Sequence, residues 1–196
     1  ASYFSQPFDL YNTSATYHGY QGSASLGNKS GDWTWWFNVN RTDSQGQPLT
    51  FPTRAISATA PAAGAVAVNG AVAGLDRNNV PWWILGTATQ YHTVQDHAKV
   101  KLAYDFSPTL RASYTMGYWN NASEGRPETY LRNVVTGAPV YNGPVSINGR
   151  GYTLTPVDFN LSNEALQHVM HGVSLKSNTQ SVWDWEVAAS MYVYSK

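Results

Sequence analysis

The sequence predicts an all-β fold: a segment of an antiparallel up-and-down transmembrane β-barrel with about six or seven long strands. Three observations support this prediction. Apolar and polar residues alternate along the strands, each arm keeps the alternation for about ten residues, and short turns alternate with two long loops. Soluble strands usually have ~5–6 residues, whereas a tilted strand that crosses a bilayer needs ~9–11. The strand length therefore favours a membrane barrel.

The clearest element is the stretch Gln95–Asn121, which predicts two long strands joined by a short turn at Ser107-Pro108-Thr109. Successive strand side chains leave opposite faces, so a period of two gives each arm one apolar and one polar face. The apolar face takes Ala98, Val100, Leu102, Tyr104 and Phe106, then Leu110, Ala112, Tyr114, Met116 and Tyr118. The polar face takes His97, Lys99, Lys101, Ala103 and Asp105, then Arg111, Ser113, Thr115, Gly117 and Trp119.

The other predicted strands flank this hairpin. Ala1–Gln6 is expected to end an earlier strand, and Pro7–Ser14 to form a loop, because Pro7, Asp9 and Asn12 are turn formers. The remaining strands, in chain order, are Ala15–Leu26 (weakened by its glycines), Trp33–Thr42, Glu164–Lys176 and Val182–Tyr194. The turns between paired strands are short and lie at residues 27–32, 107–109 and 177–181.

Two long connections separate these hairpins, at about Asp43–Thr93 and Ala122–Asn163, and both are predicted to be irregular. The Ala/Gly/Val-rich stretch Ala58–Gly74 is interpreted as a flexible loop, because the Gly-Lys-Ser/Thr of a phosphate-binding loop does not follow it. Compact soluble domains rarely need structureless loops of this length. Outer-membrane barrels combine short periplasmic turns with long extracellular loops, and the sequence predicts that arrangement.

The composition argues against several classes of function. The 12 basic and 12 acidic residues balance, which argues against a protein that binds nucleic acid through a basic surface. The chain has no cysteine, so neither a disulfide scaffold nor a cysteine metal site is expected. No apolar run approaches the ~18 residues of a transmembrane helix. These features leave a strand-built membrane protein as the favoured class.

The cost of burying charge in lipid predicts the orientation of the strands. A Lys or Arg on the lipid face at mid-bilayer costs ~2–4 kcal/mol, so charged residues of the strands are expected to face the lumen. These lumen-facing charges are Lys99, Lys101, Arg111, Lys176, Asp184 and Glu186. Their alternating neighbours would face lipid: Val100, Leu102, Leu110, Ala112, Val187 and Ala189. Aromatic residues beside the short turns fit an interfacial girdle: Trp33, Trp35, Tyr104, Phe106, Trp183 and Trp185.

Several stretches resemble the barrel of a TonB-dependent outer-membrane receptor, a family that takes up iron chelates and other scarce nutrients. They lie mainly in strands and short turns, and they identify a family rather than a ligand. The stretches are Gly22–Gly27, Gly31–Phe37, Asp43–Leu49, Gln95–Asp105, Ser107–Ala112 and Leu175–Thr179.

The resemblance implies a ~22-stranded barrel with a plugged lumen. Residues 1–196 would then be part of the barrel domain, with the plug and the energising contact segment outside this sequence. The strand pattern at Tyr192–Lys196, which runs to the last residue, also favours a piece of a longer protein. The family implies a location in the bacterial outer membrane, and as partners outer-membrane lipid, a TonB-type energising protein and a small ligand such as an iron-siderophore. Nucleic acid, cofactors and enzymatic chemistry are not expected.

Ligand-binding candidates are aromatic and cationic residues in or beside the long loops. Arginine offers a planar fork to carboxylate or catecholate oxygens, and aromatic rings stack on flat ligands. The candidates are Trp82, Trp83, Tyr91, His92, Trp119, Arg126, Tyr130, Arg132 and Tyr141. The alternative interpretation is that these residues pack the loops against one another.

Catalytic and metal sites are not expected. Asp184 and Glu186 have the spacing of a carboxylate pair on one strand face, as a glycosidase needs, but lumen charges balanced by Lys176 explain them better. His168 and His171 are three residues apart in a predicted strand, so they face opposite sides and cannot share a metal.

Two other functions stay open. A passive porin-type barrel would show the same strands without a plug. A secreted β-sandwich, either a carbohydrate-binding module or a glycosidase, would use Trp33, Trp35, Trp36, Trp82 and Trp83 as sugar platforms. The barrel segment alone is expected to aggregate in water, because its edges and apolar face are uncovered.

Overall fold

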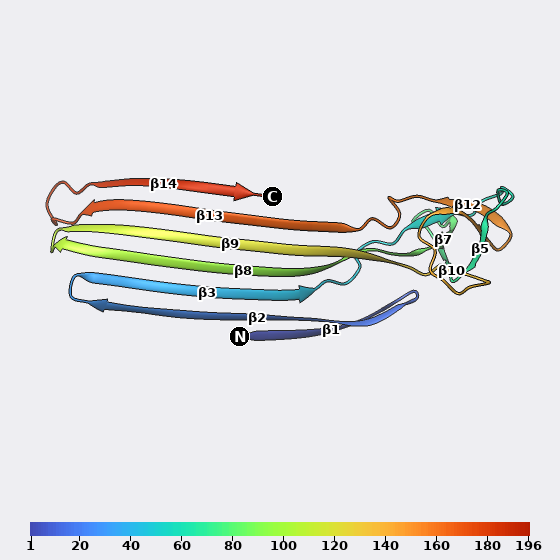
Figure 1. Ribbon diagram of the computed structural model, residues 1–196, viewed down its shortest axis with the longest axis horizontal. Helices are drawn as coiled ribbons and strands as arrows, with labels where there is room; N and C mark the ends of the chain where they lie inside the picture. Colours follow the sequence, from blue (N-terminus) through green and yellow to red (C-terminus); the bar gives the residue numbers. More distant parts are fainter.

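A seven-stranded antiparallel sheet dominates the computed structural model, which describes residues 1–196 (Figure 1). Its strand order is β1-β2-β3-β8-β9-β13-β14, and β1 and β14 are its open edges. The strands are β1 (Ser2–Leu10), β2 (Thr13–Ser30), β3 (Trp33–Gln45), β8 (Gly86–Ser107), β9 (Leu110–Thr129), β13 (Ser162–Ser177) and β14 (Glu186–Ser195). The predicted all-β, antiparallel class and the seven long strands are thus confirmed.

Most strands are longer than the predicted arms, and β8 and β9 reach 22 and 20 residues, whereas β14 has 10 residues and is shorter than predicted. The loop predicted at Pro7–Ser14 is wrong, because β1 continues through Pro7 to Leu10 and pairs with β2 along its whole length. Proline is tolerated there because an edge strand has one side without ladder partners. Only Tyr11 and Asn12 form the turn, with Tyr11 at a φ of 57°.

The two long connections are folded, so the prediction that they are irregular is wrong. Together they form what we call the loop module, residues 46–85 and 130–161. One of its sheets has the order β10-β5-β11-β12 and the other β4-β7-β6. The strands are β4 (Thr53–Ala55), β5 (Val66–Asn69), β6 (Val72–Leu75), β7 (Pro81–Ile84), β10 (Arg132–Asn133), β11 (Gly143–Ile147) and β12 (Arg150–Leu154). The supposed flexible loop Ala58–Gly74 contains β5 and most of β6.

The hydrophobic core of the chain lies in the loop module. Its members are Val68, Leu85, Leu131, Val145, Ile147, Tyr152, Leu154 and Phe159, and they come from both connections. Strand β5 from the first connection pairs in parallel with β11 from the second. Because the two connections share one core and one sheet, they fold as one unit.

An ion pair joins the two connections at the edge of this core. Arg54 Nη2 lies 2.5 Å from Asp158 Oδ2, and the Asp158 side chain is only 10% exposed. Burial alone would raise the pKa of Asp158, but donors from Arg54 and Thr155 outweigh it and hold the pKa below its ordinary value of 3.8. The charged form of Asp158 therefore stabilises the folded module.

This ion pair predicts that acid destabilises the loop module. A carboxyl group whose pKa is lower in the folded state contributes stability above its unfolded pKa of 3.8, and loses it as pH falls through the folded value. We expect protease sensitivity within residues 46–85 to rise below about pH 4. The Asp158→Asn variant should be sensitive already at pH 7, with a loss of about 2 kcal/mol from the broken pair. Equal resistance of this variant and the natural chain at pH 7 would contradict the prediction.

The loop module is attached to the sheet through the turn between β1 and β2. Asn12 Nδ2 donates to the carbonyl oxygen of Gly70 at 2.9 Å, and the hydroxyls of Thr13 and Tyr130 lie 2.6 Å apart. Gly70 has a φ of +92°, and a Cβ atom there would lie 2.1 Å from the carbonyl oxygen of Tyr130. Glycine is required at this contact, and the contact fixes the module to the sheet end.

Candidate functional site

The two faces of the seven-stranded sheet differ in polarity. The strand register shows this difference when paired residues are followed across the sheet in rows. One row places Leu26, Phe37, Val100, Met116, His171 and Met191 side by side from β2 to β14. The next row places Gly27, Trp36, Lys101, Thr115, Gly172 and Ser190 on the opposite face. We call these the apolar face and the polar face. Lys99, Lys101, Arg111 and Lys176 lie on the polar face.

The apolar face has no covering layer. Leu26, Val173 and Val187 are 65%, 53% and 65% exposed, and neither sheet of the loop module packs on them. Near the short turns Trp33 and Tyr104 lie 4.8 Å apart between ring centroids, and Tyr104 and Phe106 lie 5.0 Å apart. A groove of about 610 Å³ runs beside these rings, lined mainly by apolar side chains. The surface is suited to an apolar environment.

Polar residues limit the apolar face at the end near the loop module. Arg41 Nη1 lies 3.2 Å from Asp96 Oδ1, and nearer the loop module His92 Nε2 lies 2.8 Å from Asp43 Oδ1. Along β8 the apolar positions extend from Ala98 to Phe106, about 26 Å at ~3.3 Å per residue. At the ~35–45° tilt of barrel strands this length corresponds to a height of about 18–21 Å, somewhat below the ~25 Å apolar band of outer-membrane barrels.

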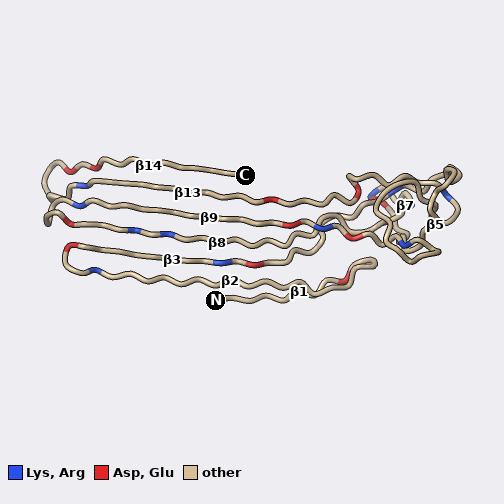
Figure 2. The backbone as a smooth tube through the Cα atoms, viewed as in Figure 1, with Lys and Arg blue, Asp and Glu red and all other residues tan.

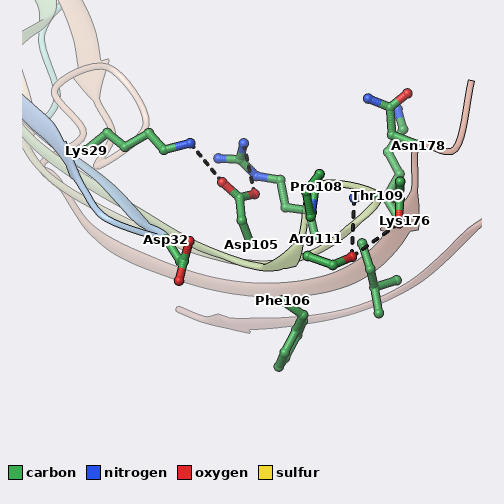
Figure 3. A pocket seen from close by; sticks show the side chains of 11 residues that line it. Lys29, Asp32, Asp105, Phe106, Pro108, Thr109, Arg111, Lys176 and Asn178 are labelled. Atoms are coloured by element: carbon green, nitrogen blue, oxygen red, sulfur yellow. Dashed lines mark hydrogen bonds and ion pairs between the residues drawn. The ribbon is translucent and has the colours of Figure 1, made fainter.

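The polar face carries a charged cavity of about 690 Å³ beside the short turns. Asp105 accepts a hydrogen bond from Lys29 Nζ at 2.9 Å and lies 3.6 Å from Arg111 Nη1. Lys176 also lines the cavity. Figure 3 shows Lys29, Asp105 and Arg111 on one side of the ribbon and Phe106 on the other. The sheet thus turns its charges and its aromatic rings to opposite sides at this end.

Asp184 and Glu186, predicted to lie on one face of the last strand, are not on the same strand. Asp184 lies in the turn before β14, where it accepts hydrogen bonds from the Thr179 amide at 2.7 Å and from Ser177 Oγ at 3.1 Å. The Thr179 amide is the main reason why the pKa of Asp184 lies below its ordinary value. Glu186 begins β14 opposite Lys176, but no ion pair joins Lys176 to either carboxylate. The predicted strand start at Val182 is therefore wrong, because Asp184 binds the turn.

The same turn separates two of the expected girdle residues from the strands. Trp183 and Trp185 lie before β14, and the Trp185 amide donates to Ser177 Oγ at 2.8 Å. Trp33, Tyr104 and Phe106 stay together on the apolar face, as predicted.

The two histidines of β13 face opposite sides, as predicted. His171 Nδ1 lies 2.7 Å from the Tyr114 hydroxyl on the apolar face. His168 lies on the polar face, where its ring packs edge-on against Trp119, Tyr192 and Tyr194. No group of His, Asp and Glu residues has a geometry that would hold a metal ion. The sequence did not reveal the aromatic group around His168, because finding it requires the register of β13 with β14.

The predicted ligand-binding candidates do not form one site. Trp83 and Tyr130 are packed: the Trp83 indole donates to the Tyr152 hydroxyl at 3.1 Å, and Tyr130 is buried against Thr13. His92 and Arg126 pair with the carboxylates of Asp43 and Glu124 near the loop module. The others are spread over the chain: Trp82 on β7, Tyr91 on β8, Trp119 on the polar face, Arg132 on β10, and Tyr141 against Phe159.

Comparison with known proteins adds no identification. No family model, no curated protein and no solved structure matches the chain. No helix in the structure is long and apolar enough to span a membrane. The structural features that bear on function are therefore the sheet with its two different faces and the loop module.

Proposed function

We propose that the chain forms part of the wall of a transport barrel in the bacterial outer membrane. The observation that carries the proposal is the apolar face, which extends along β8 from Ala98 to Phe106 and has no protein layer on it. Exposed apolar patches of this extent mark membrane or protein contacts, and outer-membrane barrels turn such an apolar band to the hydrocarbon layer. The polar face then lines a water-filled lumen, and the loop module lies outside the cell.

The topology supports closure by further strands. The seven strands alternate in direction, so β1 and β14 both run toward the loop module (Figure 1). Direct pairing of β14 with β1, within one chain or between copies related by rotation, would be parallel. An antiparallel barrel therefore needs an odd number of additional strands between these two edges. This requirement fits a barrel domain of which residues 1–196 are a part.

The proposed cargo is an iron-siderophore or a similarly scarce nutrient, taken up with energy from a TonB-type protein. The supporting features are the resemblance of the strands and short turns to TonB-dependent receptors, and the polar face with its aromatic group around His168. In this mechanism the strand residues bind and guide the solute, and no chemical conversion takes place. A β-sandwich is less well supported, because no second sheet packs on the apolar face.

Single-cysteine labelling tests the proposal, since the natural chain has no cysteine. Val100 and Lys101 are neighbours on β8 with side chains on opposite faces. In outer membranes or lipid vesicles, the Val100→Cys variant should react with a lipid-soluble maleimide and resist a charged one. The Lys101→Cys variant, the matched control, should react with the charged reagent. Equal reaction of both variants with the charged maleimide would refute the membrane location.

A further inference from the structure

The middle of the polar face carries positive charge without any carboxylate. One row contains Ser25, Asn38, Lys99, Gly117, Met170 and Tyr192, and the row nearer the turns contains Gly27, Trp36, Lys101, Thr115, Gly172 and Ser190. Lys99 and Lys101 are the charged residues of these rows, and neither takes part in an ion pair. Figure 2 shows them as two neighbouring blue segments on β8, apart from the mixed charges at the turns.

Small side chains lie directly beside these lysines. On β9, β13 and β14 the polar face presents Ser113, Thr115, Gly117, Gly172, Ser174 and Ser190. A Cβ atom on Gly172 would come no closer than 4.0 Å to any neighbouring atom. A recess of about 270 Å³ lies between Lys101 and Arg111 and is lined also by Trp36 and Thr115. Lys101 therefore borders open space, whereas Lys99 is half-buried and has Gly117 and the longer Met170 side chain in its row.

The strip of the polar face around Lys99 and Lys101, which we call the cationic lane, connects two larger features of this face. At one end is the aromatic group of Trp119, His168, Tyr192 and Tyr194. At the other end is the 690 Å³ cavity with Arg111 and Lys176. A cavity of this size is in the range of small-molecule sites, ~300–1,000 Å³. The aromatic group contains no Lys or Arg, and in the cavity Asp105 pairs with Lys29 and Arg111, so the cations without an ion pair between these two features are Lys99 and Lys101.

We infer that the cationic lane binds and conducts small solutes that carry carboxylate or phosphate groups. Charges of one sign on a low-dielectric wall raise the local concentration of counter-ions, and rings of basic residues select anions in pores. The Trp36 ring lies 5.7 Å from Lys101 Nζ and holds the ammonium group beside the lane. Several weak binding positions in series favour passage of a solute over its retention. This inference rests on the proposed function, since it requires the polar face to line a lumen.

Titration with anionic probes tests the lane. The full chain in a non-ionic detergent would be titrated by calorimetry with citrate and with tripolyphosphate, and with spermidine as the cationic comparison, at about 20 mM salt. We expect both anions to bind, spermidine not to bind, and affinity to fall as salt rises. The Lys99→Gln/Lys101→Gln variant should bind both anions about tenfold more weakly.

Two further variants separate a local site from a general effect of charge. Arg77→Gln/Arg150→Gln removes the same charge from the loop module, where Arg77 makes no ion pair and Arg150 donates to the Ala58 carbonyl oxygen. It should bind the anions as the natural chain does. Gly172→Phe fills the lane without changing charge and should also weaken binding.

Several outcomes would overturn the inference: no binding of either anion, equal losses in the two double variants, or unchanged binding by Gly172→Phe. Tighter lysine-dependent binding of a poly-glutamate peptide than of either small anion would assign the lane to an acidic polypeptide instead. The labelling of Val100→Cys and Lys101→Cys separates this result from the proposed function. If labelling places the two faces as proposed and the anions do not bind, the lane alone is refuted.

Discussion

The Met191→Arg variant is expected to assemble poorly into membranes, while Ser190→Arg assembles like the natural chain. Both positions lie on β14, and their side chains leave opposite faces of the sheet. Met191 is in the same row as Val100 and Met116, near the middle of the apolar face. A guanidinium there would enter the hydrocarbon layer at a cost of ~2–4 kcal/mol. At Ser190, beside Gly172, it would enter the water-filled side at little cost.

The measurement is urea titration of folding into lipid vesicles. The midpoint for Met191→Arg should shift to lower urea, and that for Ser190→Arg should stay within error of the natural chain. The comparison is matched, because the same charge is added one residue apart on the same strand. A larger loss for Ser190→Arg would mean that the polar face is the one in contact with lipid.

The second large effect is expected in the loop module. Leu131 has no exposed surface and belongs to the core shared by the two connections. The Leu131→Ala variant should lose about 3 kcal/mol of module stability, since truncating a buried leucine costs ~2–5 kcal/mol. Val135, which is 88% exposed on the same connection, supplies the control variant Val135→Ala. Limited proteolysis should cleave residues 46–85 and 130–161 in Leu131→Ala only.

The seven-stranded sheet should survive this substitution. Its ladders hold β8 to β9 and β9 to β13 without any core residue of the module. Circular dichroism in detergent is therefore expected to keep most of the strand signal of Leu131→Ala. Loss of the whole signal would show that the sheet depends on the module for its stability.

The long strands were predictable because their signal is local. Alternation along Gln95–Asn121 requires no knowledge of partners, and it assigns Lys99 and Lys101 to one face and Val100 and Leu102 to the other. The antiparallel direction of neighbouring strands then follows from the short turns that join them. The same reasoning placed His168 and His171 on opposite faces, which the structure confirms.

The loop module was missed because its signal is not local. Strand β5 is only four residues long, and its partners β10 and β11 lie more than sixty residues away in the second connection. Ala and Gly dominate its surroundings, which suggests a loop until the partner is known. Asp184 was misplaced for a similar reason: its hydrogen bonds to the turn outweigh the alternation that would place it in a strand.

The loop module is built from two separate connections, and this determines the order in which its parts can fold during synthesis. Six of its eight core residues lie beyond residue 130, and only Val68 and Leu85 come before β8. The first connection emerges from the ribosome earlier and has no core to fold around until the second has followed. The β8–β9 hairpin, once formed, brings the two connections together at one end. Residues 46–85 are therefore expected to stay unfolded until that hairpin forms.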